Sequence, residues 1–284
     1  MIFTARELAQ IRRLEILAAK VTKGQLQGER QTARSGPGSG FRQHRAYSEG
    51  DPLRMVDWNV YARMESLVIK EFDAEEALDL LVIQDRSASM RGAAAHCAAK
   101  IAGALGSIAL GTLDRVLWMP AGGGRPGDIY VGRARQMELL AAVDGEVSGP
   151  TDLIAAIQAQ LSRQARGGVA FVISDFFDPA GATRALSFLT ARRYQTRAIL
   201  IEDPEALAPP PLGRTRMIDR ETGETAIIDV TQGMIDEYRE TLEARVRGLQ
   251  AYCRRSGSGF LRVRADQPFF ETVRAAIARG WLTP

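Results

Sequence analysis

Apolar residues recur at helical spacing near the start of the chain, and in short continuous runs after residue 77. Residues 4–22 are predicted to form an amphipathic helix with Thr4 and Glu7 as a capping box at its start. The apolar residues on its shared face are Leu8, Ile11, Leu14, Ala18 and Val21. A glycine- and serine-rich turn follows at 35–40, and residues 41–75 are dense in aromatic and charged side chains.

From residue 78 onward, apolar runs typical of buried strands alternate with helical patterns. The predicted strands are 78–84, 115–119, 128–132, 169–174, 196–202 and 260–263. The predicted helices are 93–111, 136–143, 152–165, 183–193, 233–255 and 269–279, with a hairpin at 214–230. This alternation predicts an α/β fold, doubly wound, with a mostly parallel sheet and helices on both faces. We divide the chain into an N-terminal part, 1–76, and a main domain, 77–284, that carries the hairpin as an insertion. The N-terminal part is expected to pack on the main domain.

One predicted helix, 93–111, is almost long enough and apolar enough to cross a membrane. It contains His96 and Lys100 and depends on alanine for its hydrophobicity, and a charged group at mid-span is costly. We therefore interpret it as a core helix. Arginines at positions 6, 12 and 13 interrupt any N-terminal signal peptide. A cytoplasmic protein without a membrane span is expected.

Charge and cysteine content narrow the possible partners only a little. The formal net charge is +3, and six basic residues with a single acid lie between Lys20 and Arg45. This basic arm allows nucleic-acid binding, but it lacks interleaved aromatics before Phe41, so we favour a solvated or partner-facing arm. Cys97 and Cys253 are far apart and outside any motif, which predicts free thiols in a reducing compartment.

The strongest chemical signal comes directly after the first predicted buried strand. Asp85, Ser87 and Ser89 are spaced by two, so a tight loop can present three oxygens to one ion. In an open parallel sheet, ligands bind beyond the carboxyl ends of the strands. A D-x-S-x-S sequence alone is weak, because aspartate and serine are common turn residues. Its position after a buried strand makes the metal site the favoured interpretation.

Two later segments complete the candidate site. Thr151 begins a predicted helix and offers another hydroxyl, and Asp175 follows the clearest strand of the chain. Two carboxylates neutralise a divalent cation, and an all-oxygen donor set suits a hard ion such as Mg²⁺, or Mn²⁺ or Ca²⁺, rather than zinc. We expect one ion, with a position left for water or for a carboxylate from outside. The arrangement resembles the metal-ion-dependent adhesion site of von Willebrand factor A domains, a Rossmann-type fold.

A second signature lies upstream, in residues 41–63. Its members are Arg45, Tyr47, Gly50, Asp51, Arg54, Asp57, Trp58 and Arg63. They resemble the R-x-Y-x-x-G-D-x-x-R-x-x-D-W signature of the bacterial family called domain of unknown function 58, in which the signature precedes an A-type domain. We favour a structural role, with arginine–carboxylate pairs and a buried Trp58 pinning this segment to the main domain. A partner-docking surface is the alternative.

The resemblance covers roughly residues 25–280. It implies an A-type fold, a metal site at Asp85, Ser87, Ser89, Thr151 and Asp175, and association with a MoxR-type AAA+ ATPase. Together these features predict a metal-dependent protein-binding module that acts on a client protein not identified by the sequence. No catalytic constellation is recognised. The alternatives are a metal-dependent phosphohydrolase with Asp85 as nucleophile, which usually needs an acid where Ser87 stands, and a nucleic-acid-binding protein using the basic arm.

Overall fold

A computed structural model of the chain describes residues 2–32, 41–48, 56–72, 79–112, 115–122, 126–145, 153–161, 167–218 and 224–282. The chain divides into two compact units. The larger unit contains Met1–Gly24 and Leu78–Pro284, and the smaller contains Gln25–Ala77. The candidate metal site belongs entirely to the larger unit.

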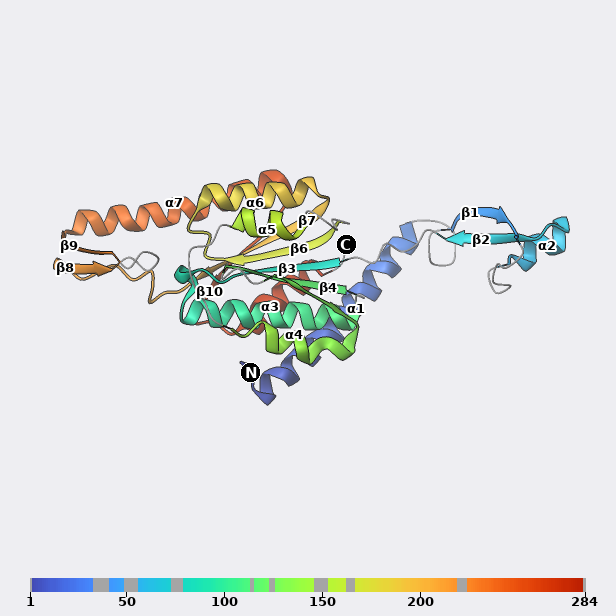
Figure 1. The fold of residues 1–284 in the computed structure, drawn as a ribbon, viewed down its shortest axis with the longest axis horizontal. Helices are drawn as coiled ribbons and strands as arrows, with labels where there is room; N and C mark the ends of the chain where they lie inside the picture. Colours follow the sequence, from blue (N-terminus) through green and yellow to red (C-terminus); the bar gives the residue numbers. More distant parts are fainter. Residues whose placement is uncertain are drawn as a thin grey trace. The chain divides into compact units, whose positions relative to one another are not determined.

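A six-stranded sheet forms the centre of the larger unit (Figure 1). Its strands are β3 (Asp79–Asp85), β4 (Arg115–Ala121), β5 (Asp128–Val131), β6 (Gly168–Ser174), β7 (Tyr194–Glu202) and β10 (Gly259–Arg264). Their spatial order is β10-β7-β6-β3-β4-β5. All neighbours are parallel except β4 and β5, which pair antiparallel at one edge. Counted along the chain, this is the 3-2-1-4-5-6 order of doubly wound nucleotide-binding sheets.

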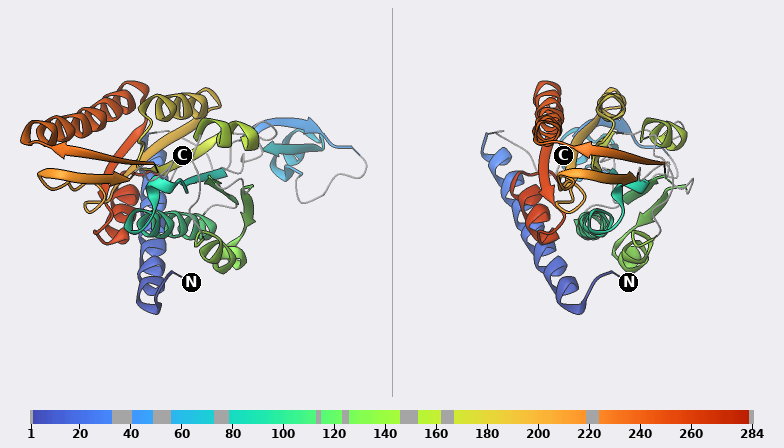
Figure 2. Two further views of the ribbon diagram at one scale, coloured as in Figure 1. Left: turned by 60° about the vertical axis from the view of Figure 1, so that its left-hand side comes forward. Right: turned by 90° about the vertical axis from the view of Figure 1, so that its left-hand side faces the viewer.

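Helices cover both faces of this sheet (Figures 1 and 2). One face carries α1 (Ala5–Thr32), α3 (Ala93–Thr112), α4 (Gln136–Ala142) and α8 (Phe269–Ala278). The other carries α5 (Leu153–Leu161), α6 (Pro179–Ala191) and α7 (Gln232–Ser256). The predicted fold class, an α/β fold with a mostly parallel sheet between helices, is confirmed.

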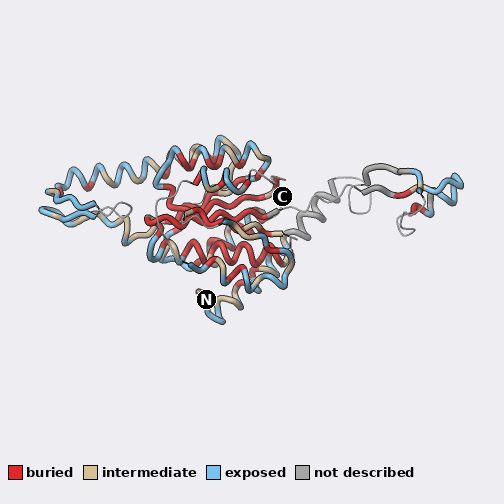
Figure 3. The backbone as a smooth tube through the Cα atoms, viewed as in Figure 1, coloured by how far each residue is buried: buried red, intermediate tan, exposed pale blue. Residues whose placement is uncertain are grey.

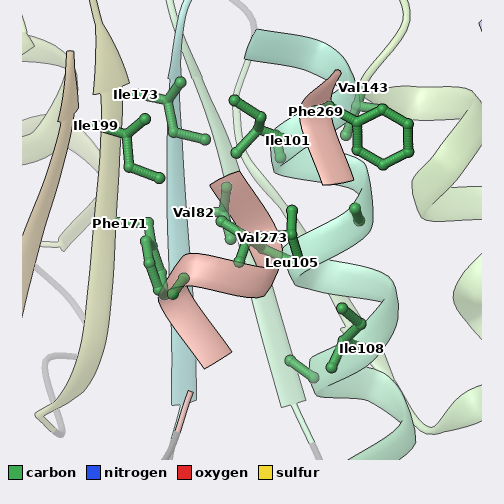
Figure 4. Packing of buried hydrophobic residues seen from close by; sticks show 14 of the residues in the cluster. Val82, Ile101, Leu105, Ile108, Val143, Phe171, Ile173, Ile199, Phe269 and Val273 are labelled. Carbon is green, nitrogen blue, oxygen red and sulfur yellow. The ribbon is translucent and has the colours of Figure 1, made fainter. Parts of the chain in front are cut away.

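The central strands are buried on both faces, which is why their sequences are continuous apolar runs (Figure 3). In β3, Leu80 and Val82 contribute to one core, whereas Leu81 and Ile83 contribute to the other. On the first face, Val82 and Phe171 pack among Leu105, Ile101 and other aliphatic residues of α3 and α8 (Figure 4). Because β3 is buried on both sides, its carboxyl end has little freedom to move.

The segment 93–111 forms α3 as predicted. By length and composition, Ala93–Gly111 is the one helix in the described part of the chain that passes as a candidate membrane span, and 78% of its most apolar window is buried inside the protein. Its small residues allow close packing, and the phenyl ring of Phe3 lies directly against Gly103. Cys97 and Cys253 are both free and buried.

The N-terminal helix corrects the expected domain division. The helix runs to Thr32 rather than to residue 22, because an existing helix can extend through a polar segment that shows no apolar periodicity. Its first part does not belong with the segment that follows. Ile11, Leu14 and Ala18 are buried in the core of the larger unit, and the side chain of Glu7 pairs with Lys100 of α3.

The smaller unit contains three elements that the sequence pattern did not predict. Strands β1 (Phe41–Ala46) and β2 (Val68–Phe72) pair antiparallel, and the short helix α2 (Trp58–Met64) lies between them in sequence. Neither strand alternates regularly between apolar and polar residues, which explains why the sequence alone left them unassigned. By contrast, the predicted hairpin at 214–230 is present as β8 (Gly213–Ile218) and β9 (Thr225–Val230), which pair antiparallel.

The packing of α1 can be tested with two isoleucines of the same helix. Ile11 is 2% exposed and Ile16 is 59% exposed. We expect Ile11→Ala to lower the free energy of unfolding by about 2–4 kcal/mol, because it leaves a cavity in the core. Ile16→Ala should change it by less than about 0.5 kcal/mol. Urea unfolding of both variants measures the difference, and equal small effects would contradict the placement of residues 1–24 in the larger unit.

Candidate metal centre

The candidate site lies where the strand order of the sheet reverses. From β3 the chain continues to β4 on one side, and it later returns to β6 on the other side, so the switch point lies between β3 and β6. Asp85 is the last residue of β3, and Asp175 directly follows the last residue of β6. Because β3 and β6 pair in parallel, both carboxylates are at the same edge of the sheet. The fold thus brings together the two aspartates that the sequence singled out.

The loop after β3 turns back on itself and gathers the serines. The backbone N–H of Ser87 donates to Asp85 Oδ1 at 2.8 Å. Ser87 is followed by a single 3-10 turn, η2 (Ala88–Met90), which brings its hydroxyl within 2.9 Å of the Ser89 hydroxyl. The D-x-S-x-S spacing therefore presents one carboxylate and two hydroxyls at one end of the sheet.

Ser174 is a site residue that the sequence reasoning missed. Its hydroxyl donates to Asp85 Oδ2 at 2.6 Å and accepts from the backbone N–H of Phe176 at 2.9 Å. Both oxygens of Asp85 thus accept one hydrogen bond each, which fixes the orientation of this buried carboxylate. The available signal was the position of Ser174 at the end of a buried strand, beside the predicted ligand Asp175.

The carboxylate of Asp175 accepts fewer hydrogen bonds than that of Asp85. The residue is only 6% exposed, and its Oδ1 accepts from the backbone N–H of Phe177 at 3.2 Å. Oδ2 is buried and has no hydrogen-bond partner among the described residues. Burial, followed by the negative charge of Asp85, raises the pKa of Asp175 to about 6, although the nearby Ser89 hydroxyl lowers it in part. A buried carboxylate oxygen without a donor costs free energy.

These residues fit a hard divalent cation. Two buried carboxylates of like charge and an oxygen without a donor leave an excess of negative charge, which a cation relieves. No cluster of three or more histidine, cysteine, aspartate or glutamate residues occurs within the ranges that the structure describes. The donors are therefore two carboxylates with neutral hydroxyls, a set that suits Mg²⁺ better than zinc. Thr151, the fifth predicted ligand, lies outside the described residues.

The turn after β6 is strained. Phe176 has a φ of +50°, a left-handed conformation that costs a bulky residue about 1 kcal/mol or more. Its ring is buried in the core, and its N–H is held by Ser174, so the surroundings enforce this conformation. The turn places the next residue, Phe177, at the surface beside the site, where it is 49% exposed. The guanidinium carbon of Arg245 lies 4.1 Å from the centre of the Phe177 ring.

Arg86 anchors the loop after β3 from behind. This buried arginine donates to the carbonyl oxygens of Ala142 and Val143 at 3.2 and 2.8 Å, and its guanidinium lies over the Trp118 ring. Its backbone N–H donates to the carbonyl oxygen of Ala121, the last residue of β4, at 2.7 Å. The loop is therefore fixed to both β4 and the end of α4. No pattern in the sequence indicated this role.

The upstream signature is described only in part. Gly50, Asp51 and Arg54 lie outside the described residues, and only the backbone of Arg45 is described, within β1. Asp57 is buried and precedes α2, where its Oδ1 accepts from the backbone N–H of Val60 at 3.4 Å. This supports a local structural role for Asp57 as a helix cap.

Trp58 is exposed within the smaller unit. It is 56% exposed, and its ring meets Tyr61 edge-on, with 6.1 Å between centroids. Trp58 begins α2, whereas Val56 and Ile69 are the buried apolar residues described in this unit. Tyr47 is half-buried, and Arg63 is exposed at the end of α2. Packing of this segment on the main domain stays a prediction.

A family model described as "Protein of unknown function DUF58" matches residues 43–251. The chain belongs to this family. The match begins in the upstream signature and extends through five strands of the sheet into the last third of α7, so it includes every candidate metal ligand. The resemblance drawn from the upstream signature is confirmed at the level of the family.

Relatives of similar length occur in mycobacteria. The uncharacterized proteins Rv1480 of Mycobacterium tuberculosis and Mb1516 of Mycobacterium bovis are each 26% identical over 287 residues, covering 95% of this chain and 88% of the relative. A shorter relative, uncharacterized protein MAV169 of Mycobacterium avium, is 27% identical over 146 residues, covering 50% of this chain and 86% of the relative.

Two solved structures have a distant likeness to the chain. One is an aerotolerance-related membrane protein from Bacteroides fragilis with multiple mutations to serines, at 16% identity and a TM-score of 0.41, covering 72% of this chain and 98% of that one. The other is the conserved hypothetical protein BatB from Bacteroides thetaiotaomicron, at 15% identity and a TM-score of 0.36, covering 71% of this chain and 96% of that one. At these scores the likeness supports no further conclusion.

The charge excess at the site predicts an unusual stability effect. We expect Asp175→Asn to raise the free energy of unfolding by about 1–3 kcal/mol at neutral pH in the presence of a chelator, because it removes a buried charge that repels Asp85. Asp236→Asn, a change of equal charge on the exposed face of α7, should be close to neutral. Thermal melts in chelator measure both variants. Destabilisation by Asp175→Asn would show that the carboxylate is satisfied without a cation.

Proposed function

We propose that the larger unit is a metal-dependent protein-binding module of the von Willebrand factor A type, holding one Mg²⁺ ion through Asp85, Ser87, Ser89, Asp175 and Thr151. The observation that carries this proposal is the unpartnered, buried Oδ2 of Asp175 beside a second carboxylate at the switch point of the sheet. When bound, the ion supplies an electrophilic centre to which an oxygen ligand from outside coordinates.

Binding fits the site better than hydrolysis. In a phosphohydrolase that uses an aspartate nucleophile, one carboxylate oxygen must be free to attack. Both oxygens of Asp85 instead accept hydrogen bonds, from Ser87 and Ser174, and a serine stands two residues on, where an acid is needed. Asp85 is thus arranged to stay in place, as a residue that positions a ligand should.

We further propose a MoxR-type AAA+ ATPase as the partner, with assembly or maturation of a client protein as the outcome, in the cytoplasm. This part rests on the family resemblance of the signature and the metal-site motif. Nucleic acid is a weaker candidate, because the net charge is only +3. The exposed Phe177 beside the ligand residues offers apolar contact area that suits a protein partner.

Metal binding should stabilise the fold, because a ligand that binds only the native state adds to its stability. We expect Mg²⁺ or Mn²⁺ to raise the free energy of unfolding of the parent by about 3 kcal/mol at a hundredfold excess over its dissociation constant. Asp85→Ala should abolish the effect. Ser107→Ala, which removes a serine of α3 distant from the loop, is the control and should leave the metal response intact. Thermal melts with metal or chelator give the answer, and a full response in Asp85→Ala would exclude the assigned site.

Loss of a metal ligand should weaken binding of the partner more than it destabilises the fold. Ser89→Ala removes one oxygen without changing charge, and Asp175→Asn removes a charge with little change of shape. We expect both to weaken Mg²⁺-dependent association with a purified MoxR-type ATPase at least about fivefold, while circular dichroism stays unchanged. Equal binding by parent and variants, together with insensitivity to chelator, would mean that the metal-bridged mechanism is wrong.

A further inference from the structure

A small open cavity adjoins the candidate metal site on the side of α7. Its volume is about 10 Å³, room for one water-sized group, and Ser89, Asp175, Phe177 and Arg245 line it together with residues at and after the end of β7. Two of these, Ser89 and Asp175, are candidate metal ligands. A molecule that coordinated the ion from this side would therefore meet Arg245.

Arg245 is held in place by its surroundings. Its neighbours on α7, Val246 and Leu249, are buried in the core on this face of the sheet, which fixes the backbone of the helix. Its guanidinium stacks on the Phe177 ring at 4.1 Å. Stacking uses the flat face of the guanidinium and leaves the N–H groups at its edge available for hydrogen bonds in the plane.

Two of these nitrogens are without a partner in the part of the chain that the structure describes. Nε and Nη1 of Arg245 are buried and lack a hydrogen-bond partner among the described residues. The nearby acids are engaged elsewhere. Glu202 pairs with Arg262 at 2.6 Å, and Asp203, which also lines the cavity, accepts from the backbone N–H of Glu205 at 3.0 Å. Arg245 as a whole is half-buried, but buried guanidinium nitrogens with unused donors are costly unless an anion joins them.

The position of Arg245 is also unfavourable for a metal ion that binds without an accompanying anion. It interacts electrostatically with Asp175, so its positive charge repels a cation bound there. The two charges become compatible when an anion lies between them. A carboxylate suits this place, because it has two oxygens and arginine recognises planar carboxylates through paired N–H donors.

We propose that Arg245, stacked on Phe177, is the second anchor for a carboxylate ligand, which binds the ion through one oxygen and Arg245 through the other. This rests on the proposed metal site. It assigns the cavity to an acidic group and makes Arg245 the residue that selects an acid over a neutral oxygen ligand. The ligand is an aspartate or glutamate side chain of the partner or a small free carboxylate, and the two share this chemistry.

The test uses the full chain, Mn²⁺ as the metal and acetate as the carboxylate. Mn²⁺ affinity is measured by the electron paramagnetic resonance signal of the free ion, in chloride and in acetate at equal ionic strength. We expect acetate to tighten Mn²⁺ binding by the parent. Arg245→Gln should bind Mn²⁺ in chloride at least as tightly as the parent, because a repelling charge is gone, but its acetate affinity should fall about tenfold.

Matched variants separate this role from a general charge effect. Arg247→Gln removes the same charge from an exposed position of α7 and should keep the parent's acetate response. Arg245→Lys keeps the charge without the planar fork and should recover part of it. A capped peptide with one glutamate, compared with its glutamine counterpart, shows whether a protein side chain also binds.

The outcomes are distinguishable. If the parent fails to bind Mn²⁺ in chloride, the metal site itself is wrong, and the role of Arg245 falls with it. If the parent binds Mn²⁺ but acetate has no effect, or if Arg245→Gln keeps the full acetate effect, only the proposal for Arg245 is overturned. Binding of acetate but not of the glutamate peptide supports the carboxylate site and identifies a small free acid as its ligand.

Discussion

The repulsion between two buried carboxylates at the switch point of the sheet is the constraint on which the site depends. Asp85 ends β3 and Asp175 directly follows β6, and these adjacent parallel strands are buried on both faces, so neither carboxylate can move far from the other. The raised pKa of Asp175 and its unpartnered oxygen both indicate that the charged form of this carboxylate is destabilised. A fold that maintains this arrangement gives up stability at one point, which is common where a ligand is bound.

The surrounding residues fit this constraint. Ser174 and the backbone of Ser87 orient Asp85, while Arg86 ties the loop to β4 and α4. The strained Phe176 lets its ring remain in the core while Phe177 reaches the surface. Stacked on Phe177, Arg245 brings a positive charge to the rim of the same cavity. The cavity is thus lined by a negative charge on Asp175 and a positive charge on Arg245, an arrangement that suits a cation and an anion bound together.

Hydrophobic periodicity predicted the larger unit well because its strands and helices bury continuous or regularly spaced apolar faces. It failed for β1, α2 and β2, because neither strand alternates regularly between apolar and polar residues and the aromatic pair Trp58–Tyr61 is exposed within the smaller unit. It also did not show where the boundary between the units falls, since an amphipathic pattern shows that a face is buried but not which unit the helix belongs to. The same limit applies to Trp58, because a large aromatic side chain predicts contact area and not its depth.

By itself, the sequence determined the α/β class, the ends of β3 and β6, and the spacing that joins Asp85 to Ser87 and Ser89, because these are local properties of strand length and loop chemistry. The tertiary structure alone decided which residues from distant segments meet them. Ser174 at the end of β6 donates to Asp85 at the end of the neighbouring strand β3, and Arg86 donates to a carbonyl at the end of α4. Arg245 lies on a helix and is seventy residues further along the chain than Asp175. Such contacts depend on strand order and helix packing, which leave no periodic trace in the sequence.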